Sequence, residues 1–136
     1  MEELTFQEMF EMQRQLQDAH PQWGGYYPER GKDSLLWAFE EMGEVVAIFK
    51  KKGAGKILSD PDVHACFLEE TADVLMYLCD MMQCLSVTPE EIADAFRKKW
   101  SYNMHRDWVS QNKKLFTHSV LSPDEPGNQT DNKKEC

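Results

Sequence analysis

The sequence predicts an all-α protein, and in particular a four-helix bundle, from three observations. Apolar residues recur at helical spacing, no alternating strand pattern competes with them, and cap and proline signals mark the expected helix starts. The length of 136 residues suits one domain with a single core. We expect that domain over residues 1–118, followed by a disordered polar tail over residues 119–136.

The first helix is predicted to begin at Thr5, which forms a capping box with Glu8, and to end near Ala19. Prolines and glycines then predict a loop over residues 20–32. This loop is rich in aromatic residues, among them Trp23. Such a ring either folds over the core or covers a planar ligand, because bases stack well on aromatic side chains.

The remaining helices are predicted from their ends. A second helix, capped by Asp33 or Ser34, is expected to stop at the lysines of residues 50–52 and Gly53. A cap followed by proline starts the third helix at residues 60–61, which runs to about residue 85. The same signal at residues 88–89 starts a fourth, which continues into a basic segment over residues 98–106.

Charge and composition limit the classes of function. A net charge of −9 argues against non-specific nucleic-acid binding, which depends on basic side chains. No run of about 18 apolar residues predicts a membrane span, and the start Met1-Glu2-Glu3 lacks the basic region of a secretory signal. The four cysteines follow no metal-ligand spacing and are expected to be reduced thiols of a cytoplasmic protein.

Two acidic phrases are set into the apolar helices, at residues 40–44 and 69–73. In a helix they place Glu41 beside Glu44, and Glu70 beside Asp73, because residues three apart are neighbours on the surface. Tryptophan, isoleucine, phenylalanine and valine share these two faces. Carboxylates among such residues need neutralisation, which divalent cations with a preference for oxygen provide.

Three interpretations of these acids are open. In the first they are solvated helix residues, which is the usual state of acidic side chains. In the second they bind two irons, which calls for Glu-x-x-His motifs that neither phrase contains. In the third they form an all-oxygen site for Mg²⁺ or Mn²⁺ that carries a phosphorylated substrate. The basic segment from Lys99 to Arg106 suits the third, because phosphate oxygens that metals leave uncovered attract cations.

The spacing Glu41-x-x-Glu44, followed by Glu70-x-x-Asp73 and the run Val-Leu-Met-Tyr-Leu, resembles the MazG-type all-α nucleoside triphosphate pyrophosphohydrolases. That superfamily includes the dCTP pyrophosphatases and the dimeric dUTPases. The similarity covers about residues 5–107 and extends to the basic motif that starts at Lys99.

The resemblance implies an enzyme that splits a nucleoside triphosphate into a monophosphate and pyrophosphate. It implies that the four acids bind Mg²⁺, with Glu41 and Glu44 in the catalytic set. It further implies that phosphate or sugar contacts come from Lys99, Asn103 and Arg106.

Further candidates carry less weight in the pattern. Glu40 is either an orienting group for water or a solvated neighbour of the site. Lys50 either faces the triphosphate or caps a solvated helix end, and Trp23 is the candidate ring near the base. The apolar faces of the four helices, together with the resemblance, predict a homodimer or homotetramer. Residues 99–106 act either within their own subunit or across subunits.

The expected function is removal of non-standard or surplus nucleotides. The alternatives are a non-catalytic helical interaction module of the same fold and a phosphoribosyl-ATP pyrophosphohydrolase. The preferred base and the phosphorus that is attacked are both open at this stage.

Overall fold

The computed structural model describes residues 3–110, and these residues form helices and connecting segments without any strand. The elements in chain order are α1 (Phe6–Ala19), the single 3₁₀ turn η1 (Pro21–Trp23), α2 (Pro28–Ser59), α3 (Pro61–Cys84) and α4 (Pro89–His105). The all-α prediction is therefore confirmed for the described chain, while the bundle type stays a prediction. The predicted tail at residues 119–136 lies outside the described residues.

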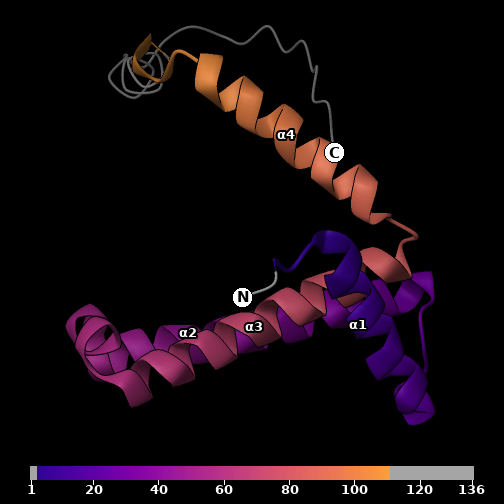
Figure 1. Ribbon diagram of the computed structural model, residues 1–136, viewed down its shortest axis with the longest axis horizontal. Coiled ribbons are helices and arrows are strands. Elements are labelled where there is room, and N and C mark those ends of the chain that lie inside the picture. Colours follow the sequence, from indigo (N-terminus) through magenta and orange to yellow (C-terminus); the bar gives the residue numbers. More distant parts are fainter. Residues whose placement is uncertain (1–2, 111–136) are drawn as a thin grey trace, which may run out of the picture. The chain divides into compact units, whose positions relative to one another are not determined.

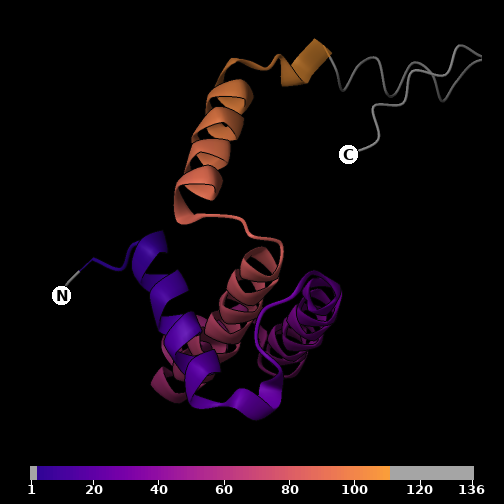
Figure 2. The same cartoon turned by 90° about the vertical axis from the view of Figure 1, so that its right-hand side faces the viewer.

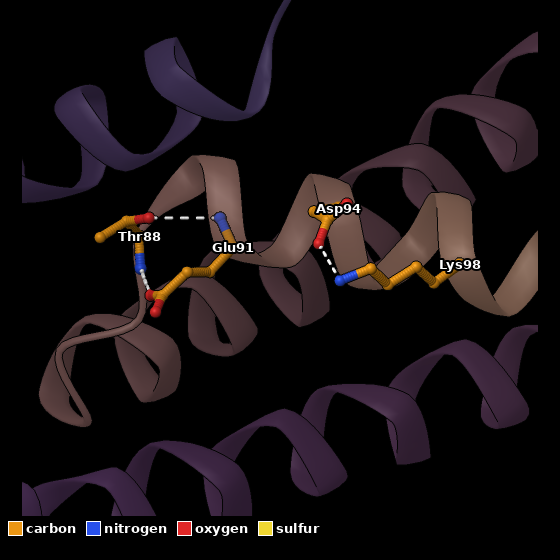
Figure 3. A network of polar contacts seen from close by, with 4 residues as sticks. All are labelled: Thr88, Glu91, Asp94 and Lys98. Carbon is orange, nitrogen blue, oxygen red and sulfur yellow. Dashed lines mark hydrogen bonds and ion pairs between the residues drawn. The ribbon is translucent and has the colours of Figure 1, made fainter.

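Capping groups define three of the four helix starts as predicted. Thr5 and Glu8 form the reciprocal capping box of α1, and the Asp60 carboxylate accepts from the amides of Asp62 and Val63 at the start of α3. At the start of α4, the Thr88 amide donates to the Glu91 carboxylate at 2.8 Å and the Glu91 amide donates to the Thr88 hydroxyl at 3.2 Å (Figure 3). Each box satisfies amides that the first helical turn leaves without a partner.

The predicted start of the second helix was wrong. The helix begins at Pro28, with Tyr27 as the capping residue, so the expected loop over residues 20–32 contains η1 and the first turn of α2. Proline is favoured in the first helical turn because its missing amide is unneeded there. Gly31 is also helical, and a side chain there would meet Cys84, the last residue of α3, and the capping residue Leu85 at 3.4 Å.

The predicted stop at Gly53 is a break in the helical backbone rather than its end. Gly53 has φ 76° and ψ 159°, and the chain then resumes helical geometry up to Ser59. Glycine occupies such a positive φ without the penalty that a side chain brings.

α2 and α3 lie side by side and antiparallel, and α1 packs against α3 (Figures 1 and 2). Ring contacts show the register, since Trp37 meets Tyr77 at a centroid distance of 5.7 Å and Phe49 meets Phe67 at 5.9 Å. As the residue number rises along α2, the number of its contact partner falls along α3, so the two helices are antiparallel. This register brings the two acidic phrases opposite each other.

The buried centre of these helices is unusually polar. Its apolar members are Phe10, Ala38, Ile57, Cys79 and Cys84. Its polar members are Gln13, Gln17, Arg30, Ser34, Asp80 and Gln83. A centre this rich in polar groups needs an internal hydrogen-bond network, and most of that network lies beside the cleft described below.

The chain divides into two compact units between Lys99 and Trp100. The second unit holds the end of α4 and, among described residues, a contact of the Arg106 guanidinium with the Trp108 ring at 4.3 Å. Cys66, Cys79 and Cys84 are free thiols. None of the helices within residues 3–110 is long and apolar enough to cross a membrane.

Candidate active site

Three carboxylates from two helices meet in one cluster. Glu41 projects from α2, and Glu70 and Asp73 project from α3 one helical turn apart. One oxygen from each lies within 4.8 Å of the others, and all three side chains are partly exposed. The antiparallel pairing of α2 and α3 creates this cluster from residues that are about thirty positions apart in the sequence.

Burial and mutual repulsion disfavour full ionisation of the acid cluster. Burial, followed by the charges of Asp73 and Glu70, raises the pKa of Glu41 above its ordinary value. Burial, and then the charge of Glu41, also raises the pKa of the neighbouring Tyr77. Both shifts have the same two causes: burial removes water that would solvate the charged form, and the negative charge nearby disfavours further ionisation.

The donor set suits a hard divalent cation. Carboxylate oxygens are what Mg²⁺ and Mn²⁺ prefer, whereas zinc and iron sites usually include histidine or cysteine. The cluster contains neither of those residue types. A cation here would also relieve the mutual repulsion of the three acids.

The other predicted ligand, Glu44, is exposed and lines a separate cavity of about 150 Å³ with Lys51 and Cys66 among others. It lies one helical turn from Glu41, and its role as a ligand stays a prediction. Glu40 is exposed beside Glu41, and its charge contributes to the raised pKa of that residue. Lys50 is exposed further along α2.

The predicted phosphate contacts belong to a different part of the chain. Lys99 and Asn103 lie in α4, and Arg106 follows the end of that helix. The Arg106 guanidinium also faces the Tyr102 ring at 6.0 Å. The role of these three residues toward a substrate stays a prediction.

A cleft of about 570 Å³ opens beside the acid cluster. Glu41 and Asp73 line it, together with the aromatic rings of Trp23, Trp37 and Tyr77. Trp23 stacks on His20 with ring centroids 4.1 Å apart, which holds it at the cleft wall. A charged end and an aromatic body are what a nucleotide site requires.

Asp80 lies at the centre of a buried network along the cleft. It accepts from the Gln17 amide at 3.1 Å and from the Tyr26 hydroxyl at 2.8 Å. Arg30 donates to the Gln17 carbonyl at 3.0 Å, and Gln83 donates to the Tyr26 oxygen at 3.2 Å. The network therefore joins α1, α2 and α3, and it fixes Gln17, Arg30 and Asp80 in the cleft wall.

Asp80, Arg30 and the glutamines of α1 were missed in the sequence-based prediction. Gln13 and Gln17 occupy positions of the apolar stripe of the first helix, where polar side chains need a reason. Asp80 follows Asp73 by seven residues and so lies on the same face of α3. Polar residues at core-facing positions were the signal for the network.

Comparison with protein families gives a match over most of the chain. The model of the dATP/dGTP pyrophosphohydrolase family matches residues 33–125, which include both acidic phrases. Comparisons with curated proteins and with solved structures find no match. The match covers well over half of the chain and agrees with the predicted resemblance to MazG-type enzymes, and the chain belongs to the dATP/dGTP pyrophosphohydrolase family.

Proposed function

We propose that this protein is a Mg²⁺-dependent pyrophosphohydrolase that converts dATP and dGTP to their monophosphates and pyrophosphate. Its task in the cell is then to remove surplus or non-standard nucleotides. The observation that supports this most strongly is the position of the acid cluster at a cleft lined by three aromatic rings. The family description supports the choice of purine substrates.

Glu41, Glu70 and Asp73 are the residues that hold the cation, with Glu44 as the proposed fourth ligand. When bound, Mg²⁺ supplies positive charge that offsets the charge of the triphosphate oxygens, and Mn²⁺ suits the same donors. The raised pKa of Glu41 supports this assignment, because burial and the charges of Asp73 and Glu70 disfavour its ionised form, and a bound cation would offset this.

The reaction adds water to one phosphorus of the α–β bridge and breaks the bond from that phosphorus to the bridging oxygen. The monophosphate and pyrophosphate then leave. Glu40 is the proposed acceptor of the proton that the water loses, because it is exposed and adjacent to Glu41. A carboxylate in such a position contributes by general base catalysis.

The rest of the nucleotide is assigned to the cleft and to basic residues. Trp23 and Trp37 are the proposed stacking rings for the base, since both line the cleft. Lys50, Lys99, Asn103 and Arg106 are proposed to contact phosphate or sugar. Cationic donors suit phosphate oxygens because charge-assisted hydrogen bonds are stronger than neutral ones.

A homodimer or homotetramer is proposed from the outer faces of α2 and α3. Large apolar side chains there are between 47% and 60% exposed, namely Leu36, Phe39, Val46, Leu68 and Leu75. A second copy of the chain covers such a surface most simply, since monomers rarely leave apolar patches this large in water. Sedimentation of the wild type should give at least a dimer and Phe39→Glu a smaller species; a monomeric wild type refutes this part.

The activity is tested with a panel of deoxynucleoside triphosphates, with Mg²⁺, by measuring released pyrophosphate and monophosphate. We expect turnover of dATP and dGTP, and loss of turnover in Glu44→Ala and Glu70→Gln. If no nucleotide is hydrolysed while metal binding is demonstrated, the protein is a non-catalytic module and the proposal is wrong. Hydrolysis of phosphoribosyl-ATP in preference to every deoxynucleotide also refutes it.

A further inference from the structure

Gln13 of α1 is a buried amide without a partner. Its side chain is only 6% exposed and lines the cleft. Across residues 3–110, no hydrogen bond of its amide is found, and the amide is not among the fully enclosed unpaired atoms, as the Ser34 hydroxyl is. Buried polar groups are normally hydrogen-bonded, so an unpaired amide at a cleft wall indicates a group reserved for a ligand.

Gln17, one helical turn further along α1, shows the contrast. Its carbonyl accepts from Arg30 at 3.0 Å and its amide nitrogen donates to Asp80 at 3.1 Å. These two partners fix the orientation of the Gln17 amide, with its oxygen toward Arg30 and its nitrogen toward Asp80. Gln13 has no such partners, so its amide is free to turn and present either its oxygen or its nitrogen.

The cleft places Gln13 away from the acid cluster. Asp73 and Asp80 both line the cleft and are seven residues apart on α3, which is about 10 Å along a helix. Asp73 belongs to the acid cluster, while Asp80 bonds to Gln17 on the same helix as Gln13. Between them lie Tyr77 and, from α2, its ring partner Trp37. A nucleotide with its phosphates at the acids therefore extends its base past these rings toward α1.

We infer that Gln13 hydrogen-bonds the six-position edge of the purine, and that its free amide turns to suit adenine and guanine alike. This rests on the proposed function. Adenine offers an amino donor at position 6 beside the N1 acceptor, and guanine offers an oxygen acceptor at position 6 beside the N1–H donor. One orientation of the amide matches adenine, and the orientation turned by half a rotation matches guanine. A pyrimidine has a similar edge but a shorter base, so it does not reach Gln13 while its phosphates stay at the acids.

The test compares Gln13→Leu with the wild type on three substrates: dATP, dGTP and the deoxynucleoside triphosphate of unsubstituted purine. Leucine has a similar size but offers no hydrogen bond. We expect kcat/KM to fall about tenfold to hundredfold for dATP and for dGTP, the range for losing a paired contact to a base edge. The unsubstituted purine, which has no group at position 6, should lose much less than either, so that all three substrates become nearly equal in the variant.

Gln15→Leu is the matched control, because Gln15 lies in the same helix but is exposed. It should leave all three values of kcat/KM unchanged. The stability of Gln13→Leu adds a second readout: replacing a buried unpaired amide by leucine should leave the urea midpoint of unfolding unchanged or higher. A lower midpoint would mean that Gln13 has a structural partner and would overturn the inference.

The two proposals fail in different ways. If the wild type hydrolyses dATP and dGTP and Gln13→Leu does so equally well, the inference about Gln13 is wrong while the proposed function stands. An equal loss for all three substrates also overturns the inference, because unsubstituted purine lacks the six-position group and offers only N1 to the Gln13 amide. If the wild type hydrolyses no nucleotide, both proposals fall.

Discussion

Replacing Asp73 by asparagine should stabilise the metal-free protein and at the same time remove its stabilisation by Mg²⁺. The variant keeps the size and shape of the side chain but removes one of the three charges of the acid cluster. Without a cation that charge is repulsive, and with a cation it is a ligand. The same substitution therefore has opposite effects on stability in chelator and in Mg²⁺.

The magnitude follows from the separation of the acids. At 4.8 Å, two unit charges repel by about 1 kcal/mol in water and by about 3.5 kcal/mol at an effective dielectric constant of about 20. Because the side chains are partly exposed, the lower figure is closer. Asp73→Asn removes the repulsion with Glu41 and Glu70, so the free energy of unfolding in chelator should rise by ~1–2 kcal/mol. For a chain of this size that corresponds to a few degrees in Tm for each kcal/mol.

Mg²⁺ should stabilise the wild type in proportion to its occupancy. At a concentration about 100 times its Kd, a ligand that binds only the folded state adds ~2.7 kcal/mol. Asp73→Asn should lose most of this gain. Since the protein is proposed to be oligomeric, all Tm values should be compared at one protein concentration.

The assay is thermal unfolding of the wild type and Asp73→Asn with EDTA and across a series of Mg²⁺ concentrations. Glu69→Gln is the matched control, since Glu69 is an exposed neighbour on α3 that lies outside the cluster. The control should follow the wild type in both conditions. A Tm in EDTA that falls in Asp73→Asn, or a Mg²⁺ shift as large as that of the wild type, would refute the reasoning.

Three further predictions follow from the same site. In EDTA, the raised pKa of Glu41 means that this carboxyl binds a proton more tightly in the folded protein than in the unfolded chain. The free energy of unfolding should therefore fall as the pH rises above 4.5 through the raised pKa. Urea titration at each pH should show a smaller fall in Glu41→Gln. Asp80→Ala leaves the amide of Gln17 and the hydroxyl of Tyr26 without an acceptor, so the free energy of unfolding by urea should drop by ~2–4 kcal/mol, and a drop below ~1 kcal/mol would contradict the network. Trp37→Ala should raise KM for dATP and dGTP about tenfold with turnover retained, whereas an unchanged KM would remove Trp37 from the base site.

Local signals in the sequence were enough to place most helices. The capping boxes at Thr5 and Thr88 and the cap at Asp60 are interactions within three residues, so a single stretch of chain contains all the information. The start of α2 was misplaced because Gly31 was taken as a breaker. Gly31 instead allows the backbone of α2 to lie close to Cys84, a residue more than fifty positions away in the sequence.

By itself, the sequence determined the helical class and the positions of the two acidic phrases, and it predicted a hard metal. Spacing within a helix and the absence of histidine beside the acids are local properties. Only the tertiary structure decided which acids meet. The register of α2 against α3 joins Glu41 to Glu70 and Asp73 and leaves Glu44 beside another cavity. The sequence also did not predict the cleft wall formed by α1, where the Gln17 amide is hydrogen-bonded and the Gln13 amide is not. Hydrogen bonds between distant segments depend on packing, which no local sequence pattern determines.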